Sequence, residues 1–256
     1  MGIRAAKGEY LFFVDSDDYW DDKEALQKID KEIIQSSADI IRFSLKRLYS
    51  DKNERVLIPD CDFSMLNNLS AERKIIQMIE LGKLKISACT MSIKRQFLES
   101  NDLFFKKGIK AEDIEWGIRL IACVPTFSFV KDCFYVYRVG REGSVTSTID
   151  YHHLCTYCDI IEDAVSIAEK CSPELKGAII SYLAYHVLIA SALNRKISIS
   201  KRQRTFIQRR LAAFCKKYLK KCSYDKRVRA AKRVYAIFGY KIMARLLGFY
   251  LMHRGR

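Results

Sequence analysis

The chain has 256 residues, of which 49% are hydrophobic, 12% aromatic and 29% charged, and its formal net charge is +15. This length and composition exclude a disordered or collagen-like chain and are ample for a buried core. The first residues lack the apolar segment of a signal peptide, and no apolar run reaches the length of an uncharged membrane-spanning helix. We therefore expect a cytoplasmic protein.

The sharpest local signal lies near the N-terminus. Residues 9–14 form a short apolar run typical of a buried strand, and the carboxylates of Asp15, Asp17 and Asp18 follow it directly. Apolar residues at helical spacing then begin at Ala25. In open α/β sheets, ligands bind at the carboxyl ends of strands, so the pattern predicts a ligand site at these acids.

The rest of the first 150 residues mixes strand and helix patterns. Strands are expected over residues 38–45, 55–58, 87–93, 124–130 and 133–138, and helices from Ala25 and over residues 71–81, 95–101 and 112–122. After Asp150 the apolar periodicity is helical throughout. These patterns predict an α/β domain over residues 1–150 and a helical, strongly basic region over residues 151–256.

The nine cysteines do not form a disulfide pattern, because their number is odd and they are scattered. We expect reduced, mostly buried thiols. Cys155 and Cys158 form one close pair, but a zinc site usually needs a second ligand pair at suitable spacing. Two thiols packed on one helix face account for this pair better than a metal does.

Three carboxylates within four positions repel one another unless a cation or hydrogen-bond donors neutralise them. A hard divalent ion such as Mg²⁺ or Mn²⁺ takes oxygen ligands and bridges phosphates, so it is the natural partner of this cluster of acids. A solvated acidic turn that caps the next helix is the alternative interpretation.

Several stretches together resemble glycosyltransferase family 2. Residues 2–20, GIRAAKGEYLFFVDSDDYW, resemble the block of that family that ends in its D-x-D motif. Further similar stretches follow in the family's order: residues 90–104 (TMSIKRQFLESNDLF), 111–113 (AED) and 137–146 (YRVGREGSVT). The resemblance implies a GT-A (Rossmann-like) nucleotide-diphospho-sugar transferase domain. It starts after the family's first β/α region, so we expect a domain that lacks the N-terminal nucleotide-binding part.

The resemblance implies an activity. A sugar would pass from a nucleoside diphosphate sugar to a hydroxyl acceptor, with inversion at the anomeric carbon, in bacterial surface polysaccharide assembly. The acceptor would be a glycan or a lipid-linked molecule, and the cofactor Mn²⁺ or Mg²⁺.

The resemblance also implies roles for particular residues. Asp17 binds the metal, and Asp15 contacts the donor or reaches the metal. Asp113 is the catalytic base, and Glu112 orients hydroxyl groups. The donor diphosphate would be held by Arg138, Arg141 and Ser144.

The C-terminal part carries the excess positive charge. Residues 195–256 contain 20 Lys or Arg and one acid, Asp225, so their charge is +19, whereas the first 194 residues sum to −4. Residues 234–252 are the most apolar stretch of this part, but Lys241 and Arg245 would cost about 5–7 kcal/mol inside a bilayer. A helix lying on an anionic membrane surface fits better, and it predicts a peripheral location on the inner face of the cell membrane.

The basic C-terminal part is also compatible with two different roles. The apolar helix could simply pack on the protein body, and nucleic-acid binding would also use the charge, although no nucleic-acid fold signature accompanies it. For the whole chain, the alternative to an enzyme is a catalytically inactive, truncated remnant that binds a membrane surface or a protein partner.

Overall fold

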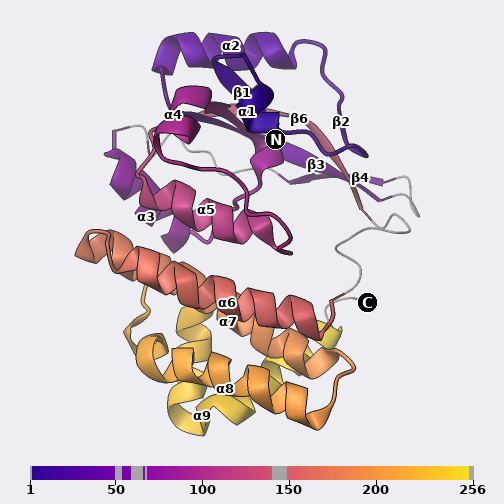
Figure 1. Cartoon of the computed structure of the whole chain (residues 1–256), viewed down its shortest axis with the longest axis vertical. Helices are drawn as coiled ribbons and strands as arrows, with labels where there is room; N and C mark the ends of the chain where they lie inside the picture. Colours follow the sequence, from indigo (N-terminus) through magenta and orange to yellow (C-terminus); the bar gives the residue numbers. More distant parts are fainter. Residues whose placement is uncertain (1, 50–53, 59–65, 67, 140–148, 254–256) are drawn as a thin grey trace. The chain divides into compact units, whose positions relative to one another are not determined.

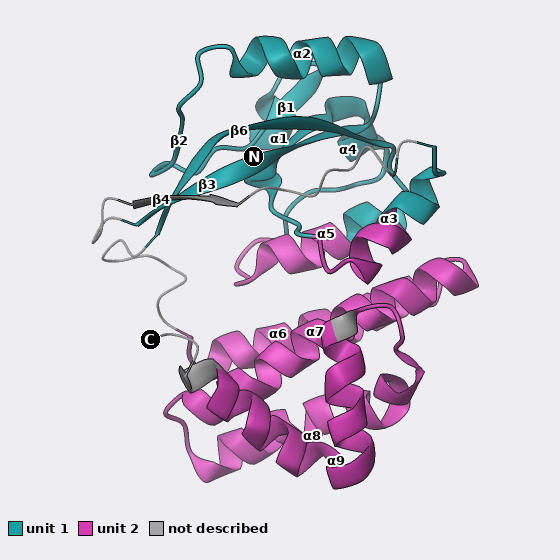
Figure 2. Ribbon diagram, turned by 180° about the vertical axis from the view of Figure 1, so that it is seen from behind, with its two compact units in different colours: residues 1–74, 85–106, 119–147 teal, residues 75–84, 107–118, 148–256 magenta. Residues whose placement is uncertain are grey.

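The computed structural model of the chain describes residues 2–49, 54–58, 66, 68–139 and 149–253 (Figure 1). Its contacts divide the chain into two compact units (Figure 2). Unit 1 comprises residues 1–74, 85–106 and 119–147, and unit 2 comprises residues 75–84, 107–118 and 148–256. Sequence alone predicted domains over residues 1–150 and 151–256. That boundary stays a prediction, because residues 75–84 and 107–118 are grouped with the C-terminal helices in unit 2.

A mixed sheet forms the centre of unit 1. Its strands are β1 (Tyr10–Phe12), β2 (Tyr19–Trp20), β3 (Ile40–Tyr49), β4 (Glu54–Ile58), β5 (Met91–Lys94) and β6 (Phe127–Val139). They are ordered β1-β5-β3-β6-β2, with β4 paired to β3. Only the β3–β6 pair is parallel among the described strands. Because β5 is antiparallel to both β1 and β3, the strands β1, β3 and β6 run in the same direction.

The long strand β6 corrects one prediction. Two strands were expected over residues 124–130 and 133–138, but a single strand runs from Phe127 to Val139. In the sequence, the polar Lys131 and Asp132 separate the two expected strands, and both residues are exposed in the structure. The pairing with β3 instead shifts register between Arg42 and Ser44, and again before Leu45. A bulge of this kind absorbs a polar interruption without ending the strand.

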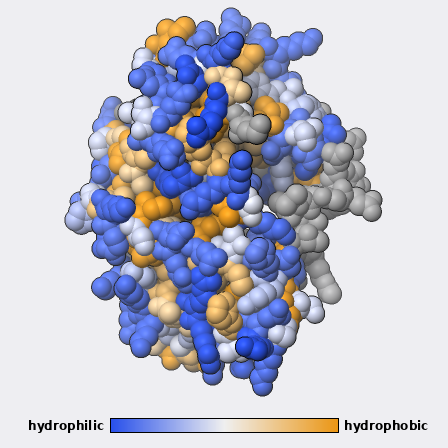
Figure 3. Space-filling model, viewed as in Figure 1, coloured by the Kyte–Doolittle hydropathy of each residue, from blue (hydrophilic) through white to orange (hydrophobic). Residues whose placement is uncertain are grey.

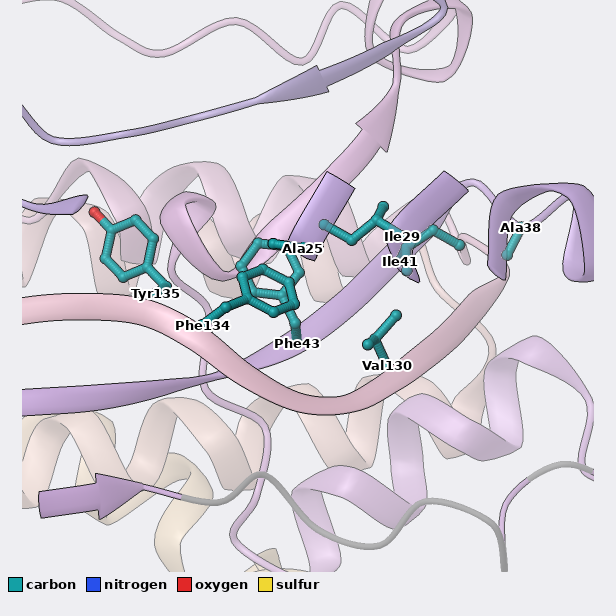
Figure 4. Close-up of a cluster of buried hydrophobic side chains, with 8 residues drawn as sticks. All are labelled: Ala25, Ile29, Ala38, Ile41, Phe43, Val130, Phe134 and Tyr135. Atoms are coloured by element: carbon teal, nitrogen blue, oxygen red, sulfur yellow. The ribbon is translucent and has the colours of Figure 1, made fainter. Parts of the chain in front are cut away.

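The hydrophobic core on one face of the sheet joins α2 (Ala25–Ser36) to β3 and β6 (Figure 4). Its buried members are Ala25, Ile29, Ala38, Ile41, Phe43, Val130, Phe134 and Tyr135. The rings of Phe43 and Phe134 lie 4.6 Å apart, and the Trp20 ring packs 5.1 Å from Phe134. Burying each large side chain contributes about 1.5–3 kcal/mol, so this core anchors the strands that carry the candidate site.

Short helices complete the α/β part of the chain. These are α1 (Gly2–Ala5), α3 (Ala71–Glu80), η2 (Ala88–Thr90), α4 (Arg95–Ser100) and α5 (Glu112–Ala122). The division between the units falls within α3 and within α5. The four helices predicted before residue 150 correspond to α2, α3, α4 and α5, and their predicted ends lie within a residue or two of the observed ones.

Unit 2 contains the helices predicted for the C-terminal region. They are α6 (Tyr151–Ala168), α7 (Pro173–Lys196), α8 (Lys201–Tyr218), η4 (Leu219–Lys221) and α9 (Lys226–His253). The Ser172 hydroxyl caps α7 by accepting from the Leu175 N–H at 3.2 Å. Ser200 and Gln203 form a reciprocal capping box at the start of α8. Such caps satisfy backbone donors that a helix start leaves unpaired.

The helix α7 lies at the centre of this helical unit and packs against α6, α8 and α9. Among the described helices it alone is long and apolar enough to cross a membrane. Its most apolar window is 72% buried inside the structure, as in the core helix of a water-soluble bundle, so its hydropathy is weak evidence for a span. On the face drawn in Figure 3, hydrophilic residues dominate the surface and apolar residues form small groups.

The described cysteines are free of disulfide bonds. Cys158, Cys215 and Cys222 are buried, whereas Cys89, Cys123, Cys133, Cys155 and Cys171 are half-buried. The prediction of free thiols is confirmed, but most are less buried than expected. Burial raises the pKa of Cys158 to about 12, which keeps it a thiol.

Candidate active site

The acidic residues near the N-terminus form a turn between β1 and β2. The Asp18 N–H donates to the carbonyl oxygen of Asp15 at 3.1 Å, which closes the turn. The Asp15 side chain is exposed and that of Asp17 is half-buried. The chain then enters the short strand β2 before α2 begins, so the acids do not lead straight into the helix as the sequence suggested.

Asp18 ties this turn to strand β6. Its Oδ2 accepts a hydrogen bond from the Tyr135 hydroxyl at 2.6 Å, and its Oδ1 accepts one from the Arg138 N–H at 2.9 Å. The Tyr135 hydroxyl in turn accepts from the Asp15 N–H at 3.3 Å. Three contacts thus fasten the turn to the carboxyl-terminal part of β6, and Asp15 and Asp17 project from an anchored backbone.

Burial has the largest effect on the pKa values of Asp18 and Tyr135. It raises the pKa of Asp18, although the hydrogen bonds from Tyr135 and Arg138 act in the opposite direction, and the neighbouring carboxylates of Asp15 and Asp17 raise it further. The pKa of Tyr135 is raised by burial and by its bond to Asp18. The phenol therefore stays protonated and remains a donor to the carboxylate.

Arg138 lies beside the same turn. It is exposed on β6 opposite Leu48 of β3, and its guanidinium stands 5.2 Å from the centre of the Tyr19 ring. At that distance a cation–π contact orients the side chain. The predicted partners Arg141 and Ser144 lie outside the described residues.

Glu112 and Asp113 begin helix α5 and belong to unit 2, whereas the acidic turn belongs to unit 1. Glu112 is exposed and Asp113 is half-buried. Acidic groups in a first turn interact favourably with the helix dipole, which gives both residues a structural role as well as a chemical one.

The residue before this helix has an unusual backbone. Ala111 adopts φ = 63°, a left-handed conformation that costs a non-glycine residue about 1–2 kcal/mol. Strain of this kind is concentrated at functional sites. It therefore adds a reason to keep Glu112 and Asp113 as candidates.

The acidic turn suits only one kind of metal binding. Among the residues that the structure describes, no group of three or more His, Cys, Asp or Glu side chains could enclose an ion. Mg²⁺ is usually bound by one or two carboxylates together with waters and substrate phosphates. The exposed Asp15 and the half-buried Asp17 fit an ion held partly by a substrate, but not a closed protein cage.

The hydrogen bonds of Asp18 give it the role of positioning the turn. Sequence reasoning missed its partner Tyr135, which lies 117 positions after Asp18 in the chain. The alternation of residues 135–138 indicated a strand, but no local signal pairs a strand tyrosine with a distant acid.

Comparisons with known proteins agree with this architecture. Residues 1–100 match the sequence profile described as Glycosyl transferase family 2. Residues 1–100 are therefore similar to glycosyltransferase family 2, and the mixed α/β part of the chain is consistent with the predicted GT-A-like domain. Both predictions are confirmed.

Two curated relatives extend the match beyond residue 100. The chain is 24% identical over 204 residues to poly(ribitol-phosphate) beta-N-acetylglucosaminyltransferase TarS of Staphylococcus aureus strain Mu50. It is 25% identical over 205 residues to the protein of the same name from strain MW2. Each match covers 78% of this chain and 32% of the relative, so the chain spans about a third of the length of these relatives.

Proposed function

We propose that this chain carries out sugar transfer from a nucleoside diphosphate sugar to a hydroxyl group of a glycan acceptor, with inversion at the anomeric carbon. The observation that carries the proposal is the anchored acidic turn: Asp15 and Asp17 project from a backbone that Asp18 binds to β6, within the segment that matches the family. A rigid pair of carboxylates at strand ends suits the diphosphate side of a donor site.

The metal proposal concerns Asp15 and Asp17. Their carboxylate oxygens are hard ligands suited to Mn²⁺ or Mg²⁺, with the donor diphosphate completing the coordination. When bound, such an ion neutralises negative charge on the departing diphosphate. Arg138, exposed beside the turn, is suited to contact diphosphate oxygens through its guanidinium, and Arg141 and Ser144 are proposed for the same role.

Asp113 is the proposed general base. A carboxylate within hydrogen-bond reach of the acceptor hydroxyl takes its proton as the oxygen attacks the anomeric carbon, a contribution of about 10²–10⁴-fold in rate. Glu112, exposed one position earlier, would orient acceptor or sugar hydroxyls.

The acceptor we propose is a phosphate-bearing glycan or polyol of bacterial surface polysaccharide assembly. The names of both relatives describe transfer to poly(ribitol-phosphate), a polyanion. The charge of +19 over residues 195–256 would attract such a polymer. A cavity of about 780 Å³ in unit 2, lined by Lys201, Arg202 and Arg209 among others, is a basic surface suited to such a polymer.

The test is a turnover assay of the full chain with labelled UDP-N-acetylglucosamine, a ribitol-phosphate oligomer and Mn²⁺. We expect product from the unaltered chain, loss of product with EDTA, and at least roughly a 100-fold loss in Asp17→Asn and in Asp113→Asn. The matched control is Asp30→Asn, an exposed carboxylate on α2, which should retain full turnover.

Two outcomes would contradict the proposal. Undiminished turnover in both Asp17→Asn and Asp113→Asn would remove the roles assigned to these residues. A folded chain that neither turns over nor binds any of a panel of nucleoside diphosphate sugars would favour the alternative of a non-catalytic binding protein.

A further inference from the structure

The helix α9 exposes large apolar side chains just before and beyond its bend at Gly239. Between 40% and 73% of each side chain is exposed to solvent, and the residues are Ile237, Phe238, Ile242, Leu246, Phe249 and Tyr250. We call this set, together with Lys241 and Arg245, the α9 face. Scattered exposed apolar residues are ordinary, but their concentration over residues 237–250 of one helix points to an interaction surface.

The α9 face is organised in two neighbouring rows. Beyond the bend at Gly239, residues Ile242, Leu246 and Tyr250 recur at intervals of four and line one side of the helix. Lys241, Arg245 and Phe249 form the adjacent row, and both cations are exposed. Positive charges therefore lie directly beside an apolar stripe.

The opposite side of the same helix is used for packing. Met243, Ala244 and Gly248 are buried, and an added Cβ on Gly248 would approach the Arg195 Cβ of α7 to 3.0 Å. This close approach orients the C-terminal half of α9 on α7. The α9 face is therefore not the helix's packing side.

An apolar groove continues the α9 face. A cavity of about 450 Å³ lies between α7 and α9, and its walls include Leu188, Ile189, Val234, Met243, Leu246 and Tyr250. Leu246 and Tyr250 thus belong to both the groove and the α9 face. Arg227 lies at this groove with its guanidinium 3.5 Å from the centre of the Tyr185 ring.

Charge identifies the partner. The acid in residues 195–256 is Asp225, and its carboxylate is already bound to Arg227. Self-association through the α9 face would bring Lys241 and Arg245 near the same cations of a second copy. Nucleic acid would pair with the cations but would leave the apolar row exposed to water. An anionic bilayer has negative headgroups next to an apolar layer, so it can contact the cations and the neighbouring apolar row at the same time.

We propose that the α9 face docks on an anionic lipid bilayer, with Ile242, Leu246 and Tyr250 entering the interface and Lys241 and Arg245 contacting headgroup phosphates. Docking of this kind holds the chain peripherally on the inner face of the cell membrane. It uses neither the acidic turn nor the sugar donor, so it stands or falls independently of the proposed transfer activity.

The experiment is co-sedimentation of the full chain with vesicles of phosphatidylcholine containing 30 mol% phosphatidylglycerol, compared with vesicles of phosphatidylcholine alone. We expect binding to the anionic vesicles that weakens between low and high salt. The double variant Ile242→Ser with Leu246→Ser should lower the partition coefficient by about tenfold or more, because it removes apolar area from the interface.

Two further variants make the result decisive. Phe206→Ser is the matched control, because Phe206 is 48% exposed on α8 and is not part of the α9 face, so this variant should bind as the unaltered chain does. Lys241→Glu with Arg245→Glu keeps the apolar row and should abolish the preference for anionic vesicles. All the substituted side chains are exposed, and circular dichroism checks that each variant is folded.

Several results would overturn the proposal. One is equal binding by the unaltered chain and the Ile242→Ser, Leu246→Ser variant. Another is a dimer in gel filtration that this variant converts to a monomer, since the α9 face would then bind a second copy. A third is binding to a DNA duplex that the apolar substitutions leave unchanged, with no binding to vesicles.

Discussion

Asp18 illustrates how one half-buried carboxylate organises its neighbours. Its two oxygens accept from the Tyr135 hydroxyl and the Arg138 N–H, and these bonds connect residues 117 and 120 positions apart in the sequence. A hydrogen bond to a charged group contributes roughly 1.5–3 kcal/mol when it forms away from bulk water. Asp18 therefore supports the turn from which Asp15 and Asp17 project.

This role predicts coupled effects on stability. Asp18→Ala should lower the free energy of unfolding by roughly 1–3 kcal/mol, because it leaves the buried Tyr135 hydroxyl without its acceptor. Tyr135→Phe in the Asp18→Ala background should cost much less than in the unaltered chain, since the bond is already lost. Urea unfolding of the two single variants and the double variant forms the thermodynamic cycle. Strictly additive effects would show that the bond contributes nothing.

His186 is a buried titratable group in α7. Its Nδ1 lies 2.6 Å from the Tyr157 hydroxyl oxygen, and the rings of Tyr182 and Tyr185 pack around it. Burial lowers the pKa of His186 to about 4, and the positive charge of Arg227 acts in the same direction. The unfolded chain should titrate near the ordinary value of about 6.5.

This difference predicts that the chain loses stability in acid. Between pH 6.5 and pH 4 the unfolded state binds the proton that His186 does not accept when folded, so stability falls as the pH is lowered. The loss from His186 should be roughly 2 kcal/mol between pH 7 and pH 5. Urea unfolding at both pH values measures it, and His186→Gln should reduce the pH dependence by that amount. His153, whose pKa burial also lowers, contributes to the remainder.

At the scale of elements, the bend in α9 decides where the α9 face points. Gly239 adopts φ = 71° and ψ = −179°, which only glycine adopts readily, and it interrupts an otherwise continuous helix. A Cβ at this position would meet no atom within 4 Å. The requirement for glycine is therefore one of backbone conformation and not of space.

Gly239→Ala should consequently destabilise the chain by about 1–3 kcal/mol, or straighten α9 and displace its C-terminal half from α7. Thermal unfolding followed by circular dichroism measures both the stability and the helix content. Gly2→Ala is the matched control, because a Cβ there also meets no atom within 4 Å and no left-handed φ is involved. An unchanged melting temperature and helix content in Gly239→Ala would refute the role of the bend.

At the scale of the whole molecule, charge is strongly segregated. The first 194 residues sum to −4, whereas residues 195–256 carry +19. Ion pairs such as Arg210 with Asp159 and Glu162 on α6 offset a small part of this excess. The remaining like charges repel one another within the helical unit, and salt screens such repulsion over about 8–10 Å.

The chain should therefore become more stable as NaCl is raised from about 20 mM to 300 mM. A gain of about 1 kcal/mol corresponds to roughly 2–4 °C in Tm for a chain of this size. Differential scanning calorimetry across the salt series provides the measurement, and a sucrose series of equal osmolality is the control. A falling Tm would mean that the ion pairs outweigh the repulsion among the excess cations.

Much of the secondary structure was predictable because hydrophobic periodicity is a local property. The strands β1, β3, β4 and β5 and the helices beginning at Ala25, Ala71, Arg95 and Glu112 lie near where the sequence placed them. The short strand β2 was not expected, and residues 88–90, expected within a strand, form η2. The continuity of β6 was not predictable, since a register shift against β3 absorbs the polar Lys131 and Asp132. Pairing of distant segments depends on contacts that no local pattern contains.

The sequence by itself determined the resemblance of residues 1–100 to glycosyltransferase family 2, the positions of Asp15, Asp17, Glu112 and Asp113, and the division into an acidic body and a basic C-terminal part. These depend on residue identity and order alone. Only the tertiary structure decided that Tyr135 anchors the acidic turn, that α7 is a buried core helix, and that one side of α9 stays exposed. The physical reason is that burial and hydrogen bonding between distant residues exist only once the chain has packed.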